Sequence, residues 1–293
     1  MAINRSKIRR VALNLIYSVL ENGGSPADVD NRLFWEIAQE KEQDQFRKTY
    51  AKAMLHATRA SADSAHLLAE RSSALEDAMH GDLTTSTLRD NAARFARRSA
   101  DLETTLETLQ FSLTDKRRVD SAPLAEYTEE ALQLAMILKT LGEELLTQLA
   151  DFPAYRQVTE PYAAIVRRRI RLMDAVTPLA SPAQLSDNKE YAGLARQAQD
   201  LADMRPAVEA LANEVLDNRT ELEATMGQLL EHYSTERVDT VDRVILLIAL
   251  HELKNKGLET PIVVAEATAM AHEYSGSQSA RFIHGIIAAA AKA

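Results

Sequence analysis

The fold is decided by the last part of the chain, residues 236–293, which read ERVDTVDRVILLIALHELKNKGLETPIVVAEATAMAHEYSGSQSARFIHGIIAAAAKA. This stretch predicts three helices, because Gly257 and Gly276 interrupt it and Pro261 suits the opening of the second helix. The first helix has apolar residues at helical spacing and Thr240 as a candidate cap. One apolar face must therefore be buried, with Val241, Val244, Ile245, Ile248, Ala249 and Leu253.

The other two helices of this stretch carry apolar residues at the same spacing. The second is predicted to bury Ile262, Val263, Ala267, Met270 and Ala271, and the third carries Phe282, Ile283, Ile286 and Ile287. Three short helices, each with an apolar side, indicate a helical bundle.

The composition favours helix throughout the chain. The 293 residues suffice for one large or two ordinary domains, and there are only 9 glycines and 5% aromatic residues. No cysteine is present, which excludes disulfides and thiolate chemistry and is typical of a reducing compartment. We expect a cytoplasmic protein without a membrane span, because no apolar run approaches about 20 residues. The N-terminus faintly resembles a secretion signal, but Asn14 and Tyr17 interrupt its apolar stretch, which argues against export.

The net charge of −9 argues against a surface that binds nucleic acid everywhere, since such affinity comes largely from neutralising phosphates. Any RNA site must be a local patch. Residues 5–21 offer one, because Arg5, Lys7, Arg9 and Arg10 gather at the start of an amphipathic helix. Cations there oppose the helix dipole, so the patch requires a compensating partner. Phosphate is one candidate, and the alternative is a solvated basic end.

Several motifs are similar to those of the NusB family of transcription-antitermination factors. They are Val238-Asp239, Val241-Asp242-Arg243, Ile245-Leu246, Ala249-Leu250-His251-Glu252-Leu253, Pro261, Val264-Ala265-Glu266-Ala267 and Ser279-Ala280-Arg281-Phe282-Ile283-His284-Gly285. At the other end, the arginine-rich helix ends in Ile16-Tyr17, where the family has Leu-Tyr. Ala265, His284 and His251 stand where the family usually has Asn, Asn and Tyr.

The resemblance implies an all-α fold with a NusB-like helical bundle core that is interrupted by an insertion. We expect residues 1–41 and 190–293 to form the core, and residues 42–189 to form inserted helical bundle or coiled-coil hairpins. Residues 27–41 predict a helix with Val29, Leu33, Phe34 and Ile37 inward, and Trp35 as a packing anchor. Further helices are expected at residues 44–79, 87–113, 123–150 and 159–176, and a pair within 190–232 divided at Asn218 or Thr220.

No pattern in the sequence is typical of an enzyme. None of the seven histidines pairs with another at helical ligand spacing, and no Gly-rich phosphate loop or nucleophile motif occurs. We therefore expect no catalytic residue, no metal and no cofactor. A NusB-like domain also precedes a methyltransferase domain in ribosomal RNA cytosine methyltransferases. This chain ends directly after the NusB-like helices and has no catalytic cysteine, which argues against that activity.

The resemblance points to nine candidate RNA-binding residues: Arg5, Lys7, Arg9, Arg10, Tyr17, Asp242, Arg281, Phe282 and His284. Arginine and lysine bind phosphates, and Tyr or Phe can stack on the exposed bases of single-stranded RNA. Tyr17 and Phe282 equally suit a helical core, and Asp242 equally suits a first-turn partner of the helix dipole. The basic run Arg167-Arg168-Arg169-Ile170-Arg171 is either a surface that pairs with carboxylates or a second RNA contact.

The resemblance implies that the chain binds boxA-type single-stranded RNA in nascent ribosomal transcripts. It would do so together with NusE, the small-subunit ribosomal protein that doubles as an elongation factor. Other Nus factors and RNA polymerase are indirect partners. An alternative keeps the fold and loses specific RNA binding. In that case the acidic chain, Ala265 and His284 indicate a scaffold whose insertion forms a homo-oligomer or binds another protein.

Overall fold

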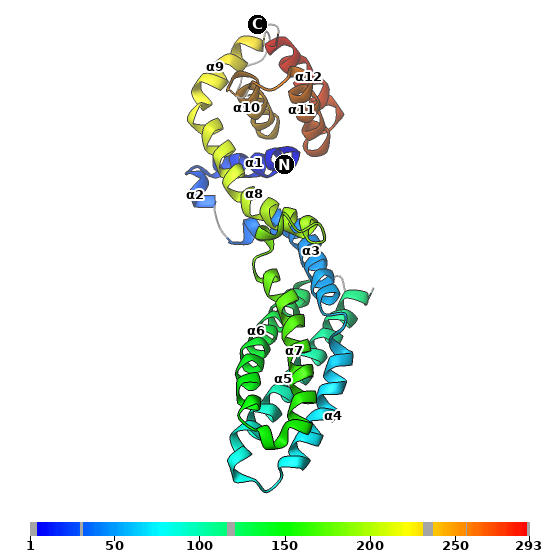
Figure 1. Ribbon diagram of the computed structural model, residues 1–293. Helices are drawn as coiled ribbons and strands as arrows, with labels where there is room; N and C mark the ends of the chain where they lie inside the picture. The colour runs from blue at the N-terminus through cyan, green and yellow to red at the C-terminus, as the bar shows by residue number, and fades with distance from the viewer. Residues whose placement is uncertain (1–4, 30–31, 116–120, 231–236, 256, 292–293) are drawn as a thin grey trace. The chain divides into compact units, whose positions relative to one another are not determined.

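The computed structural model describes residues 5–29, 32–115, 121–230, 237–255 and 257–291, and all regular structure in these ranges is helical (Figure 1). The predicted all-α class is confirmed. The long helices are α1 (Arg5–Asn22), α3 (Arg32–Ala57), α4 (Ser61–Met79), α5 (Ser86–Thr114), α6 (Ala122–Ala150), α7 (Arg156–Val176), α8 (Ala192–Asp217), α9 (Arg219–Leu229), α10 (Thr240–Asn255), α11 (Thr260–Tyr274) and α12 (Ser277–Ala290). Shorter elements are α2 (Pro26–Val29) and the 3₁₀ turns η1 (Leu83–Thr85), η2 (Pro153–Tyr155), η3 (Thr177–Ala180) and η4 (Pro182–Leu185).

The chain forms two compact units. Unit 1 comprises residues 1–40 and 200–293, and unit 2 comprises residues 41–199. Both boundaries fall inside helices, one in α3 and the other in α8. The sequence-based division places the boundaries after residues 41 and 189. That residues 42–189 are an insertion stays a prediction.

Helix α10 is the centre of unit 1. It packs against α1, α9, α11 and α12, and α11 and α12 also pack against each other (Figure 1). Every residue from Val244 to Leu250 is buried. The sequence analysis predicted one buried face, but this helix is enclosed on all sides, as its nearly continuous apolar run VILLIAL allows. Its cap is Asp239 rather than Thr240, because an Asp239 carboxylate oxygen accepts from the Val241 amide at 2.9 Å.

Three residues that were predicted to point inward are exposed. Leu33 and Ile37 are 64% and 66% exposed, and Ile262 is 47% exposed. The predicted helix over residues 27–41 is instead α2 followed by α3, with residues 30–31 outside the described ranges. In α3 it is Trp35 that enters the core of unit 1, with Phe34 edge-on against its ring. Leu33 and Ile37, four residues apart, share a different face of the helix.

Unit 2 contains a four-helix bundle. Consecutive helices α4, α5, α6 and α7 pack side by side, and α4 packs against α7 to close the ring (Figure 1). The connections are short, so neighbouring helices are antiparallel. The predicted seam residues of α5 lie in the core, among them Leu88, Phe95 and Leu102. A bundle, rather than an extended coiled-coil hairpin, is therefore the architecture of this unit.

A buried arginine fixes the start of α4. Arg169 of α7 is fully buried, and its Nη1 donates to the Ser61 carbonyl at 2.9 Å, the Ser61 hydroxyl at 2.8 Å and Glu103 Oε1 at 2.9 Å. The sequence predicts one helix over residues 44–79, but α3 ends at Ala57 and α4 begins at Ser61. No glycine or proline marks this break, so the sequence signals are silent there. Arg167, Arg168 and Arg171 remain exposed, and Arg167 pairs with Glu160 at 3.4 Å.

Among the described residues, none of the helices combines the length and the apolar character needed to cross a lipid bilayer.

A close helix contact in unit 2 leads to a stability prediction. A Cβ atom at Gly142 of α6 would lie 2.9 Å from Ile170 Cγ1 and 3.2 Å from Phe95 Cε2, whereas a Cβ at Gly193 of α8 meets nothing within 4 Å. Gly142→Val should lower the free energy of unfolding by about 1–3 kcal/mol more than Gly193→Val, because both add the same side chain and only one overpacks the core. Urea unfolding followed by circular dichroism measures the difference. Equal midpoints for the two variants would contradict the close packing.

Candidate nucleic-acid interface

The four basic residues at the start of α1 lie in different environments. Arg5 is exposed, Lys7 and Arg10 are half-buried, and Arg9 is only 3% exposed. All four belong to the first turns of the helix, but they do not form one open basic surface. Arg9 in particular faces the inside of unit 1.

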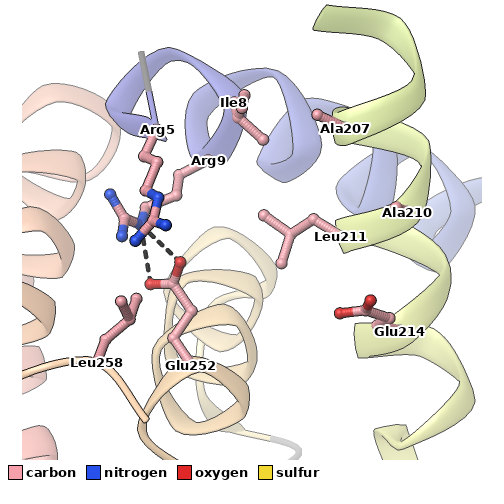
Figure 2. A pocket seen from close by; sticks show the side chains of 9 residues that line it. All are labelled: Arg5, Ile8, Arg9, Ala207, Ala210, Leu211, Glu214, Glu252 and Leu258. Atoms are coloured by element: carbon pink, nitrogen blue, oxygen red, sulfur yellow. Dashed lines mark hydrogen bonds and ion pairs between the residues drawn. The ribbon is translucent and has the colours of Figure 1, made fainter. Parts of the chain in front are cut away.

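The partner of Arg9 is Glu252 in the last turn of α10. Arg9 Nε donates to both carboxylate oxygens, at 2.9 and 2.8 Å, and Glu252 is itself buried (Figure 2). The two residues are 243 positions apart in the sequence. Desolvated charges of this kind persist only when they are paired, so this ion pair joins the first helix to the central one.

Carboxylates of α11 serve the neighbouring residues. Arg10 Nε donates to Glu273 Oε2 at 2.7 Å, and Arg10 Nη1 lies 3.8 Å from Glu266 Oε2. The Ser6 hydroxyl donates to the same Glu266 oxygen at 2.7 Å. The compensation that cations at a helix N-terminus require is thus supplied from within the protein by Glu252, Glu266 and Glu273.

The helical spacing contained a signal for the buried pair that the sequence analysis did not use. Arg9 stands four and seven residues before Leu13 and Ile16, so it shares their buried face. Glu252 stands four and seven residues after Ile248 and Ile245, on an apolar face of α10. One positive and one negative residue on apolar faces of two helices indicate a buried ion pair.

A pocket of about 340 Å³ opens beside this ion pair. Arg5 and Arg9 reach it from α1, Leu211 and Glu214 from α8, and Glu252 from α10, while Leu258 closes another side (Figure 2). The structure therefore brings together two of the nine predicted residues, Arg5 and Arg9, at the edge of a concave site.

The remaining predicted residues are dispersed. Tyr17 is 37% exposed, whereas Phe282 is half-buried and packs against the core of unit 1. Arg281 and His284 are exposed on α12. Asp242 is 6% exposed, and its Oδ1 atom has no hydrogen-bond partner. In the described part of the chain, no hydrogen bond or ion pair joins the α12 residues to Arg5, Arg9 or Arg10.

Tyr274 is an aromatic residue near the basic patch that the sequence analysis missed. It ends α11, next to Glu273, and is 38% exposed. Partial burial and the Glu273 carboxylate raise the pKa of the Tyr274 hydroxyl, and Arg10 opposes that shift. Arg10 of α1 donates to Glu273, the residue before Tyr274, so a basic side chain of α1 reaches this end of α11. A helical tyrosine directly after a glutamate gives no sequence signal of that proximity.

The three departures from the family pattern have separate positions. His251 is buried in α10, and its Nε2 atom lies 3.1 Å from Glu214 Oε2 of α8. Ala265 and His284 are exposed. Among the residues that the structure describes, no three His, Cys, Asp or Glu side chains gather where they could hold a metal ion.

Comparison with known proteins identifies the class of this fold. The model of the NusB family matches residues 167–292, beginning ahead of residue 190, where we expected the family pattern to resume. The chain therefore carries a NusB-family domain, and the helical region N-terminal to that domain is consistent with an insertion. The match does not extend to α1, so the family role of the arginine-rich helix stays a prediction.

The similar curated proteins are transcription antitermination proteins NusB. The protein of Solibacter usitatus is 29% identical over 82 residues, which are 28% of this chain and 56% of that relative. The protein of Campylobacter hominis is 28% identical over 85 residues, 29% of this chain and 65% of the relative. The protein of Aromatoleum aromaticum is 34% identical over 80 residues, 27% of this chain and 54% of the relative. The chain thus spans between about half and two thirds of these relatives, and no solved structure matches it significantly.

The burial of Arg9 predicts that its loss affects folding before it affects binding. Arg9→Ala leaves the Glu252 carboxylate buried without its partner and should lower the free energy of unfolding by about 3–5 kcal/mol. Arg10→Ala removes a more exposed pair and should cost at most about 1 kcal/mol. Trp35 is the only tryptophan and lies in the core of unit 1, so its fluorescence during urea unfolding reports this difference. An Arg9→Ala variant as stable as Arg10→Ala would show that the pair is not structural.

Proposed function

We propose that this protein is a non-enzymatic transcription antitermination factor that binds boxA-type single-stranded RNA in nascent ribosomal transcripts, together with NusE. The observation that carries the proposal is the NusB-family domain at residues 167–292. The relatives from Solibacter usitatus and Campylobacter hominis, both transcription antitermination proteins by name, support it further.

The basic end of α1 supplies the phosphate contacts in this proposal. Arg5 is exposed, and Lys7 and Arg10 are half-buried, so all three reach a ligand at the surface. Their charges set the register of the RNA backbone, and Tyr17 and Phe282 stack on bases. Arg9 has a positioning role, because its ion pair with Glu252 holds α1 against α10. Asp242, Arg281 and His284 remain predicted contacts.

The partners and the location follow from the same proposal. NusE binds beside the RNA, and other Nus factors and RNA polymerase are joined through the complex. The protein acts in the cytoplasm, where transcription takes place. Self-association belongs to the second candidate function and is not part of this proposal.

That second candidate is a NusB-like scaffold without specific RNA binding. Two observations favour it. Carboxylates of α11 already occupy Arg10, and Leu33 and Ile37 expose apolar surface on α3. In this alternative, the helical region 42–189 binds another protein or a second copy of the chain, and RNA binding is only a general polyanion effect.

Fluorescence anisotropy with a labelled boxA-type RNA and a scrambled RNA tests the proposal. We expect tighter binding of the boxA-type RNA, strengthened by NusE. The double variant Arg5→Ala/Arg10→Ala should weaken binding and flatten the salt dependence by about 1.4 in the slope of log K against log salt, for two lost phosphate contacts.

Arg32→Ala/Arg219→Ala is the matched control. It removes the same charge from two arginines of unit 1 that pair with glutamates one turn along their own helices. This control variant should retain the preference for boxA-type RNA over scrambled RNA and the wild-type slope of log K against log salt. Equal weak binding of both RNAs, even with NusE, would refute the proposal and favour the scaffold.

The ion pair of Arg10 predicts a gain of affinity. RNA phosphates compete with Glu273 for Arg10, so Glu273→Gln should tighten RNA binding several-fold at low salt, because the competing charge is removed. Glu21→Gln changes the net charge equally from an exposed position at the end of α1 and is the control. The same small effect in both variants would mean that Arg10 does not contact the RNA.

A further inference from the structure

The pocket beside Arg9 has walls suited to a flat apolar group. Ile8 of α1, Leu211 of α8 and Leu258 after α10 supply aliphatic surface. A volume of about 340 Å³ lies near the lower end of the range of ligand pockets, about 300–1,000 Å³, which favours one small group over an extended ligand.

The charges of the lining exclude a phosphate as the preferred occupant. Arg5 and Arg9 contribute two positive groups, and Glu214 and Glu252 contribute two negative ones, so the formal charges cancel. An anion placed here would gain from the guanidinium groups and lose against the carboxylates. A neutral group with hydrogen-bond donors and acceptors on one edge satisfies both kinds of side chain.

One buried donor in the lining lacks an acceptor. Arg9 is 3% exposed, and its Nη2 atom has no hydrogen-bond partner, although Nε is engaged with Glu252. Leaving such a donor unsatisfied is unfavourable, so this side of the pocket favours an acceptor group of a ligand over another donor. Glu252, the partner of Arg9 Nε, also lines the pocket and offers acceptor oxygens for an N–H group of the same ligand (Figure 2).

We propose that this pocket binds one unstacked nucleobase of the single-stranded RNA, with Arg5 at its rim on the adjoining phosphate; this inference rests on the proposed function. Guanine, uracil and cytosine carry a carbonyl together with an N–H donor, as the lining requires, whereas adenine has no carbonyl. A phenylalanine, tyrosine or tryptophan side chain of a protein partner fits the apolar walls, but it presents at most one polar atom to the arginine and the carboxylates. The base is therefore the better match.

A scan with single abasic sites tests the inference. BoxA-type RNAs that each lack one base are titrated by anisotropy against the full-length protein. For the wild type we expect one position at which losing the base weakens binding about tenfold and at which adenine is the least tolerated base. Ala210 is exposed and lines the pocket, so Ala210→Trp fills the space without entering the core, and it should abolish the sensitivity at that position.

Ala202→Trp is the matched control, since Ala202 is exposed on the same helix and is not part of the pocket lining. It should keep the wild-type scan. A preference for boxA-type RNA combined with a scan that Ala210→Trp leaves unchanged would overturn the base pocket and leave the proposed function standing. An Ala210→Trp variant that no longer binds NusE but keeps the wild-type sensitivity to abasic sites would also overturn the base pocket. Absence of any preference for boxA-type RNA in the wild type would overturn both the base pocket and the proposed function. If Ala210→Trp does not fold, RNAs with adenine at the sensitive position, titrated against the wild type, decide whether the pocket binds a base: adenine tolerated as well as the other bases would overturn the base pocket.

Discussion

The buried ion pair between Arg9 and Glu252 is the interaction on which unit 1 depends. It places a positive charge of the first helix against the last turn of the central helix, where burial makes each charge unfavourable without the other. Because α10 is enclosed by four helices, the same pair also fixes how α1 lies relative to α11. Arg10, one position further, then faces Glu266 and Glu273.

Three carboxylates, Glu252, Glu266 and Glu273, neutralise the arginines at the start of α1, which explains how these cations are accommodated at a helix N-terminus. Their effects are unequal, because Glu252 is buried and acts on stability, whereas Glu273 is about half exposed and, in the proposed function, competes with RNA phosphates. In the proposed function, a phosphate backbone therefore meets Arg5 directly and meets Arg10 only after displacing a carboxylate. In the proposed function, this balance sets the affinity for RNA, rather than the number of arginines.

Unit 2 uses the same device in a different place. Arg169 is surrounded by the first turn of α4 and by Glu103 of α5, and it donates hydrogen bonds to Ser61, the first residue of α4. In both units, the most basic segment of sequence thus contributes one arginine to the interior and leaves its neighbours outside. Counting basic residues in a helical run overestimates the charge available to a ligand, since helical geometry turns one of them toward the core.

The amino-acid sequence by itself determined the helical class, the seam of α5, the presence of a break between α8 and α9 at Asn218 or Thr220, and most of the apolar core of the last three helices, because these depend on local spacing. The structure places that break at Asn218. The tertiary structure decided which charges are available. The partner of Arg9 lies 243 residues away, and no local pattern measures that proximity. It likewise decided that Leu33 and Ile37 face solvent and that α10 is enclosed on every side. Burial depends on which neighbours cover a helix, and periodicity reports only that one of its faces is apolar.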